Sequence, residues 1–199
     1  MAEHSNLADS YLKYKIAVSG AAITSHCSRD ALEKAEALGQ AIAQTGSVLV
    51  TGATTGVPYW AAKGAKQAGG IVIGISPAAT RVQHVKTYKL PTDYHDLIIY
   101  TGFGYSGRNL LFTRSADAVV TLCGRIGTLN EFTDAFEDHK VQGILTDNEN
   151  GTSALIPKIL EEAHRGVGSV IYDPDPRALV SRVMAALKDA AQGEEKAAL

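Results

Sequence analysis

The stretch AVVTLCGRIGTLNE, residues 118–131, decides the fold of this chain. Its first five residues form an apolar run typical of a buried strand, and a helical pattern continues through Phe132, Ala135 and Phe136. The glycines between them let the backbone approach a ligand, and free N–H groups and the dipole at a helix start favour negative charge. The sequence therefore predicts a site for a phosphate-bearing ligand at this turn.

Similar short apolar runs recur along the chain and alternate with amphipathic segments. The expected strands cover residues 15–20, 47–51, 71–75, 97–100, 118–122, 143–146 and 169–172. Continuous Val, Ile and Leu runs indicate strands that are buried on both faces, as in a parallel sheet covered by helices. We expect an α/β, three-layer, doubly wound, mainly parallel Rossmann-like sheet of about seven strands. It forms one domain over residues 1–199, with flexible ends at 1–14 and 192–199.

Ligands of such sheets bind beyond the carboxyl ends of the strands, at a switch point in strand order. Two further turns at strand ends could contribute there. The first expected strand ends at Gly20, and the second leads into Gly52, Thr54, Thr55 and Gly56. Neither turn has the dinucleotide-binding or P-loop spacing. Phosphate binding by these turns is thus a hypothesis, and turns without any ligand are the alternative.

Residues 76–96 form a long connection with little regular pattern. Loops of this length in a compact domain are uncommon and often close over or bind a ligand. The segment carries charged and aromatic side chains, namely Arg81, His84, Lys86, Tyr88, Tyr94 and His95. A binding loop and a surface loop packed by its own tyrosines are equally consistent with this composition.

Composition excludes several classes of function. The formal net charge is −2, which gives no general attraction to nucleic acid or to an anionic membrane. No apolar run is long enough to span a bilayer, and residues 1–10 have no secretory signal, so we expect a cytoplasmic protein. Cys27 and Cys123 alone make neither a disulfide framework nor a four-ligand site. The six histidines show no ligand spacing, so we expect no metal.

Several side chains near the main turn admit a functional and a structural interpretation. Arg108 would project from the first turn of an expected helix at 107–114, where it binds an anion or pairs with a surface acid. Thr128 and Glu131 fit a capping box, yet Glu131 could also act as an acid or base. Arg125 adds a second positive charge. Cys123 at a helix entrance could be a nucleophile, or simply a small turn residue.

Three segments in order resemble one protein family. They are TGATTGVPYWAAKGAKQAGGIVIG at 51–74, GRNLLFTRSADAVV at 107–120 and CGRIGTLNE at 123–131. Together they are similar to the LOG-like family, the Rossmann-type proteins once labelled lysine decarboxylases. That family includes cytokinin riboside monophosphate phosphoribohydrolases and molybdenum cofactor carrier proteins. The resemblance spans about residues 15–138, and it implies a homodimer or a larger homo-oligomer.

The hydrolase branch implies specific roles for residues of this chain. Arg108 and Glu131 match its catalytic pair, and Gly124, Gly127 and Thr128 match its 5′-phosphate site. The implied reaction cleaves the N-glycosidic bond of a nucleoside 5′-monophosphate to free base and ribose 5-phosphate. A nearby carboxylate would stabilise the oxocarbenium-like transition state, and no cofactor is required.

Three positions depart from the hydrolase pattern. Cys123 and Arg125 replace a proline and a glycine, and Asn109 follows Arg108 where the hydrolases usually have lysine. The Arg-Asn pair is more similar to the carrier branch. The alternative function is therefore a non-catalytic carrier or sensor of a nucleotide or a molybdopterin-like phosphate. An oligomeric scaffold with a degenerate pocket is the third hypothesis. No pyridoxal phosphate site is visible around Lys63 and Lys66, so nothing in the sequence supports lysine decarboxylation.

Overall fold

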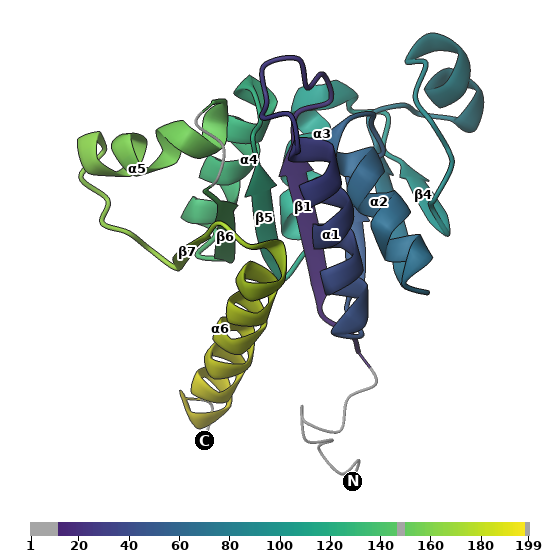
Figure 1. The fold of residues 1–199 in the computed structure, drawn as a ribbon. Coiled ribbons are helices and arrows are strands. Elements are labelled where there is room, and N and C mark those ends of the chain that lie inside the picture. The colour runs from purple at the N-terminus through teal and green to yellow at the C-terminus, as the bar shows by residue number, and fades with distance from the viewer. Residues whose placement is uncertain (1–11, 147–149, 198–199) are drawn as a thin grey trace, which may run out of the picture.

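The computed structural model describes residues 12–146 and 150–197, and its central feature is a seven-stranded sheet (Figure 1). The strands are β1 (Lys15–Gly20), β2 (Val48–Thr51), β3 (Ile71–Ser76), β4 (Leu97–Tyr100), β5 (Ala118–Leu122), β6 (Val141–Leu145) and β7 (Val170–Asp173). Their order is β4-β3-β2-β1-β5-β6-β7, and each neighbouring pair is parallel. This confirms the predicted α/β Rossmann-like class.

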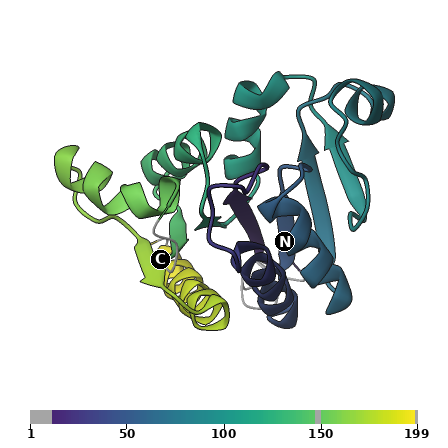
Figure 2. The ribbon, with the colours of Figure 1, turned by 45° about the horizontal axis from the view of Figure 1, so that its top comes forward.

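Helices cover both faces of the sheet (Figure 2). One face carries α1 (Ala31–Gln44), α2 (Val57–Gln67) and α6 (Pro176–Ala197), and the other carries α3 (Gly104–Arg114), α4 (Ile126–Glu137) and α5 (Thr152–Glu162). The strand order reverses between β1 and β5, where Gly20 is paired with Leu122. The carboxyl ends of these two strands therefore form the switch point at which such sheets bind ligands.

The central strands β1, β2, β5 and β6 bury side chains on both faces, as their apolar runs predicted, whereas Leu97 and Ile99 of the edge strand β4 are exposed. Ile16 and Val18 of β1 pack into the core beneath α1, α2 and α6, whereas Ala17 between them packs with Phe112 of α3. Because helices cover both faces, the middle of β1 has no exposure to solvent: Ile16, Ala17 and Val18 are all fully buried. The strand ends are thus held rigidly at the edge where the loops begin.

Small residues bring α1 and α2 into close contact. A Cβ atom on Gly39 would overlap the carbonyl oxygen of Ala61, and one on Gly64 would overlap that of Glu36. The Ala- and Gly-rich surface of α2 therefore packs within the chain. This backbone contact sets the position of α2 and of the turn that precedes it.

Some boundaries differ from the sequence prediction. The α3 helix begins at Gly104, three residues before the expected start, and β6 begins at Val141 instead of residue 143. The α6 helix continues to Ala197, so residues 192–197 are helical where we expected a flexible end. The expected flexible segment 1–14 lies outside the described residues except for positions 12–14. Within the described part, no helix is both long and apolar enough to cross a membrane.

Candidate functional site

A cavity of about 340 Å³ lies at the switch point, beyond the carboxyl ends of β1 and β5. This volume is within the usual range of small-molecule sites. Its wall comes from the loop after β1, the turn after β2, the start of α3 and the turn that leads into α4. The lining residues are Gly20, Ala21, Ala22, Thr54, Tyr105, Arg108, Asn109, Arg125, Ile126, Gly127, Thr128 and Glu131. The cavity is thus where the topology predicted a ligand.

The turn after β5 presents backbone N–H groups at the cavity. The α4 helix begins at Ile126, and the first backbone hydrogen bond of its first turn joins the Leu129 N–H to the Arg125 carbonyl. The N–H groups of Ile126, Gly127 and Thr128 have no hydrogen-bond partner among the described residues. Gly124 has a φ of 101°, which favours glycine. Free N–H groups at a helix start favour an anion here.

The predicted capping box is wrong, because the helix begins earlier than that motif requires. Thr128 lies in the first turn of α4, and Arg125 occupies the N-cap without a side-chain capping bond. Glu131 is consequently free of a capping role, and its carboxylate turns into the protein. The structure thus favours the alternative in which Glu131 belongs to the site.

Arg108 and Glu131 form a buried ion pair on the floor of the cavity. Arg108 Nη1 donates to Glu131 Oε1 at 3.1 Å, and the hydroxyl of Ser19 donates to Glu131 Oε2. Their side chains are only 6% and 8% exposed. In the orientation that satisfies its amide, Asn109 Nδ2 also donates to Glu131 Oε1, at 3.0 Å. Both carboxylate oxygens therefore have protein donors.

Burial dominates the electrostatics of this pair. It raises the pKa of Glu131 above its ordinary value, against the opposing effects of the Arg108 guanidinium and the Ser19 hydroxyl. It lowers the pKa of Arg108, but a guanidinium stays charged at neutral pH. Arg108 Nε has no hydrogen-bond partner in the described structure, although it is buried. A buried donor without a partner is costly, so this atom marks a place where a ligand acceptor fits.

Arg125 provides a second cation at the mouth of the cavity. Arg125 is exposed, and among the described residues its guanidinium makes no hydrogen bond or ion pair with another side chain. Its backbone is fixed, because the Thr152 hydroxyl donates to the Arg125 carbonyl at 2.8 Å. Two arginines and one glutamate give the cavity a net positive charge when all three are ionised, which suits a phosphate.

The structure brings most of the predicted site residues together. Eight of them line the cavity: Gly20, Thr54, Arg108, Asn109, Arg125, Gly127, Thr128 and Glu131. Gly52 lies beneath it, where an added Cβ atom would overlap the Arg108 guanidinium. Gly124 shapes the turn without lining the cavity.

Two predicted residues support the wall from outside. Thr55 Oγ1 donates to the Ala22 carbonyl at 3.0 Å, and a Cβ on Gly56 would overlap the Ala21 carbonyl. Both residues therefore position the loop after β1, and neither lines the cavity itself.

The sequence analysis missed Ser19 and Tyr105. Ser19 is the last inward-facing residue of β1, and its contact with Glu131 joins residues 112 positions apart. Tyr105 lies one helical turn before Arg108, in the part of α3 that was expected to be a loop. An earlier helix start would have placed Tyr105 beside Arg108, so the i, i+3 spacing was the available signal.

The long connection 76–96 packs beside the sheet instead of lining the cavity. It contains the short π-helix Gln83–Thr87, and the buried His84 lies 2.8 Å from Ser76 Oγ and 2.9 Å from the Pro91 carbonyl. Tyr88 of this segment contacts the cavity lining, because its ring lies 5.5 Å from that of Tyr105. This geometry agrees with the interpretation of a packed surface loop.

The two cysteines, too few for a disulfide framework, are joined by a pairing that was not predicted. Cys27 and Cys123 form a disulfide with Cα atoms 5.8 Å apart, although they are 96 positions apart in sequence. The loop after β1 and the turn after β5 meet because parallel neighbouring strands end at the same edge. Cys123 is therefore not a free nucleophile in this structure.

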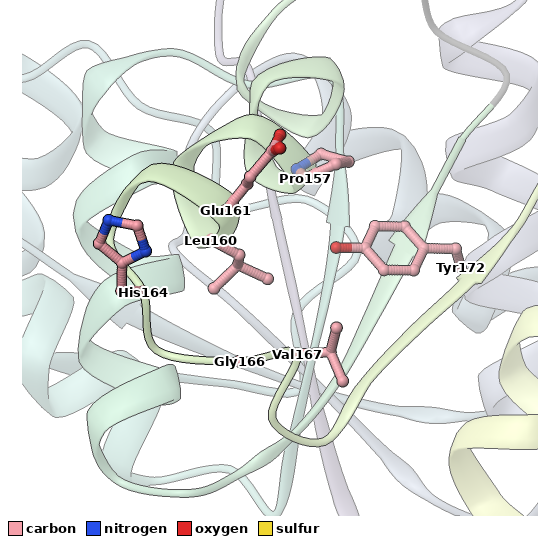
Figure 3. A pocket seen from close by; sticks show the side chains of 7 residues that line it. All are labelled: Pro157, Leu160, Glu161, His164, Gly166, Val167 and Tyr172. Atoms are coloured by element: carbon pink, nitrogen blue, oxygen red, sulfur yellow. The ribbon is translucent and has the colours of Figure 1, made fainter.

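A second cavity, of about 600 Å³, lies away from the switch point (Figure 3). Its lining comes from α5, from the segment that follows α5 and from β7, as Figure 3 shows. Leu160, Val167 and Pro157 make much of this wall, and it includes no arginine or lysine. It therefore lacks the positive groups that distinguish the cavity at the switch point.

Comparisons with known proteins place the chain among relatives with the same architecture. A molybdenum cofactor binding protein of Rippkaea orientalis is 28% identical, with a TM-score of 0.74 over 89% of this chain and 99% of that one. The molybdenum cofactor carrier protein of Chlamydomonas reinhardtii is 29% identical, with a TM-score of 0.71 over the same shares. DNA processing protein A of Streptococcus pneumoniae, at 18% identity and a TM-score of 0.62 over 85% of this chain and 61% of that one, shares the fold alone.

Sequence comparison gives the family. An uncharacterized protein of Archaeoglobus fulgidus is 33% identical over 114 residues, which are 57% of this chain and 70% of that one. The sequence model of the SLOG cluster4 family matches residues 13–180, which include every strand and the whole cavity. This agrees with the LOG-like resemblance found in the sequence. The chain is a member of the SLOG cluster4 family.

Proposed function

We propose that this chain binds a phosphorylated nucleotide or a molybdopterin-like phosphate in the cavity at the switch point, and holds it without cleaving it. The observation that carries the proposal is the arrangement of unpaired donors around one space. The first turn of α4, with its free N–H groups, and the exposed Arg125 line it, and so does Arg108, whose buried Nε has no partner among the described residues. Charge-assisted hydrogen bonds from such groups are the usual means of binding phosphate.

Binding without turnover is favoured by the state of Glu131. Its Oε1 accepts from Arg108 and its Oε2 accepts from Ser19, so both oxygens of this buried carboxylate are already engaged by protein donors. A general base must reach the proton that it removes within hydrogen-bond distance. The likeness to molybdenum cofactor binding and carrier proteins, at 28% and 29% identity over nearly their whole length, also supports a carrier.

Hydrolysis of an N-glycosidic bond is the second candidate. It is supported by the position of Glu131 on the cavity floor and by the raised pKa of its buried carboxyl. A carboxyl whose pKa is raised by burial keeps its proton to a higher pH, as a general acid requires. In this candidate a bound phosphate draws Arg108 away, and Glu131 then faces the sugar.

One experiment separates the two candidates. Purified protein is screened by thermal shift against nucleoside 5′-monophosphates and molybdopterin, and free base and ribose 5-phosphate are assayed in the same wells. We expect a stabilising shift without released base. Release of base that is lost in Glu131→Gln and kept in the exposed Glu137→Gln would establish the hydrolase. The absence of any shift and any product would contradict both candidates.

A further inference from the structure

Three metal-ligating side chains meet beside the turn, outside the lining of the cavity. They are His26 and Cys27 on the loop after β1, and Cys123 at the end of β5. The ligand atoms of all three lie within 4.8 Å of one another. Cys123 is buried, while His26 and Cys27 are half-buried, so one side of the group is open to solvent.

The spacing of these atoms matches the needs of a tetrahedral zinc site. His26 Nε2 lies 3.5 Å from Cys123 Sγ and 4.0 Å from Cys27 Sγ. With zinc bonds of about 2.3 Å to sulfur and about 2.0 Å to nitrogen, a tetrahedral ion places a nitrogen and a sulfur about 3.5 Å apart. The two sulfurs would be about 3.8 Å apart around the same ion. Binding of an ion would therefore require that the disulfide between Cys27 and Cys123 be opened.

The surroundings indicate which side of the disulfide would move. The backbone of Cys123 is held by the Ser153 N–H, which donates to its carbonyl at 2.9 Å. Gly151 lies against the Cys123 sulfur so closely that an added Cβ would be 2.9 Å from it. Cys27 lies on a loop with exposed neighbours, among them Ser25 and Arg29. Cys123 therefore provides a fixed ligand, and Cys27 can rotate away from it.

We propose that the reduced form of this chain binds one Zn²⁺ through His26 Nε2, Cys27 Sγ and Cys123 Sγ, with water in the fourth position. A dithiol or phosphine reductant first supplies two electrons, with two protons from solvent, and converts the disulfide into two thiols while the reductant is oxidised. Zn²⁺ then replaces the two thiol protons, which are released to solvent. The disulfide and the ion exclude each other, because both use the same two sulfurs.

The site adjoins the phosphate-binding turn through the Gly124 carbonyl. His26 Nε2 lies 3.1 Å from that oxygen, which also accepts the Thr152 N–H at 3.3 Å. A bound ion takes the Nε2 lone pair, so His26 loses this contact while Thr152 keeps its own. The ion, like the disulfide, would hold the loop after β1 against the turn. His26, Cys27 and Cys123 show no ligand spacing along the chain, which is why no metal was expected, and the three side chains meet only in the fold.

Cobalt serves as the spectroscopic probe for the test. The protein is reduced with a phosphine, freed of reductant without oxygen, and titrated with Co²⁺ and then with Zn²⁺. We expect thiol titration to give no free thiols before reduction and two afterwards. We expect the reduced form to bind one Co²⁺ per chain with a thiolate-to-cobalt charge-transfer band and strong tetrahedral absorption. Zn²⁺ should abolish both, and the oxidised form should show neither.

Variants of the ligands provide the controls. Cys27→Ser and His26→Asn should weaken binding by more than the tenfold to hundredfold that is usual for loss of an outer-shell partner. His139→Asn is the matched control, because His139 is exposed, has a φ of 55° that asparagine tolerates and lies outside the group. A reduced protein without the thiolate band, or an oxidised protein that binds equally well, would overturn the proposal. So would two free thiols before reduction, or equal binding by the ligand variants.

Discussion

Arg108 Nη1 lies 3.1 Å from Glu131 Oε1, and this ion pair joins the first half of α3 to α4 beneath the cavity. Both side chains are more than nine-tenths buried. A buried pair of this kind is a weak source of net stability, because desolvation offsets the attraction between the charges. Loss of one partner, however, leaves the other charge uncompensated. The pair therefore makes the cavity floor sensitive to single substitutions.

The first prediction concerns Arg108→Met. The variant keeps an unbranched apolar side chain in place of the arginine stem but leaves Glu131 without its cation, and we expect a loss of about 3–5 kcal/mol in the free energy of unfolding. Urea denaturation measures this loss. Arg114→Met is the control on the same helix, because Arg114 makes an exposed ion pair with Asp138. A loss in Arg108→Met no larger than that of the control would contradict a buried pair.

The pH dependence of stability gives the second prediction. The pKa of Glu131 in the folded protein is raised above its ordinary value of 4.5, so the folded state binds more protons than the unfolded state between those two values. The stability contribution is therefore full below the ordinary pKa and is lost as pH rises through the raised one. Denaturation at a series of pH values should show wild type losing stability relative to Glu131→Gln across that window.

The exposed Glu137 on the same helix provides the control for that measurement. Glu137→Gln removes a carboxylate without changing the buried pair, so the difference from wild type should lack the slope seen for Glu131→Gln. A difference curve for Glu131→Gln that stayed flat, or that rose with pH, would show that burial does not dominate at Glu131.

The third prediction separates stability from binding at Gly127. An added Cβ on Gly127 meets no atom within 4 Å, and this position lies in the first turn of α4 at the cavity. Gly127→Ala should stabilise the helix by up to about 1 kcal/mol, because alanine loses less backbone entropy than glycine. The same methyl group should weaken binding of a phosphorylated ligand, since it stands where the backbone meets the phosphate.

Gly193→Ala is the matched variant, because it also adds a Cβ in open space within a helix, far along the chain from the cavity. Calorimetric titration of both variants with the ligand found in the thermal-shift screen provides the comparison. Equal affinity in Gly127→Ala and wild type would contradict contact between the phosphate and the first turn of α4.

The contact between α1 and α2 gives the fourth prediction. Gly39→Ala would push a methyl group into the Ala61 carbonyl, and a backbone atom cannot rotate away. We expect a loss of about 1–3 kcal/mol in unfolding free energy, as in other overpacked cores. Thermal and urea denaturation measure it, with Gly193→Ala as the control. A stabilised Gly39→Ala would show that the helices are less closely packed than the structure has them.

The sequence predicted the architecture well because the fold depends on short-range patterns. The run from Ala118 to Leu122 is apolar except for the buried Thr121, because β5 is buried on both faces, and the turn with its glycines follows it. The identity of the strands and the position of the cavity at the switch point were accessible for that reason. Helix boundaries were less accessible: α3 begins at Gly104, which has a positive φ, and not at the expected residue 107.

The parts of the site that sequence missed depend on contacts between distant segments. The Ser19 hydroxyl reaches Glu131, and Cys27 joins Cys123, only because β1 and β5 are neighbours in the sheet. No spacing along the chain indicates such a contact. The capping box is a pattern that the sequence contains but the fold does not use. Thr128 and Glu131 have the right spacing, but the helix starts before them.

The most direct test of the account compares phosphorylated ligands with their unphosphorylated counterparts by isothermal titration calorimetry. The series consists of nucleoside 5′-monophosphates with the matching nucleosides, together with molybdopterin. We predict that at least one phosphorylated compound binds with one site per chain, and that a matching nucleoside binds at least about tenfold more weakly, because charge-assisted hydrogen bonds each contribute about 1.5–3 kcal/mol. Binding of no phosphorylated compound, or equal affinity for a nucleotide and its nucleoside, would contradict a phosphate site at this turn.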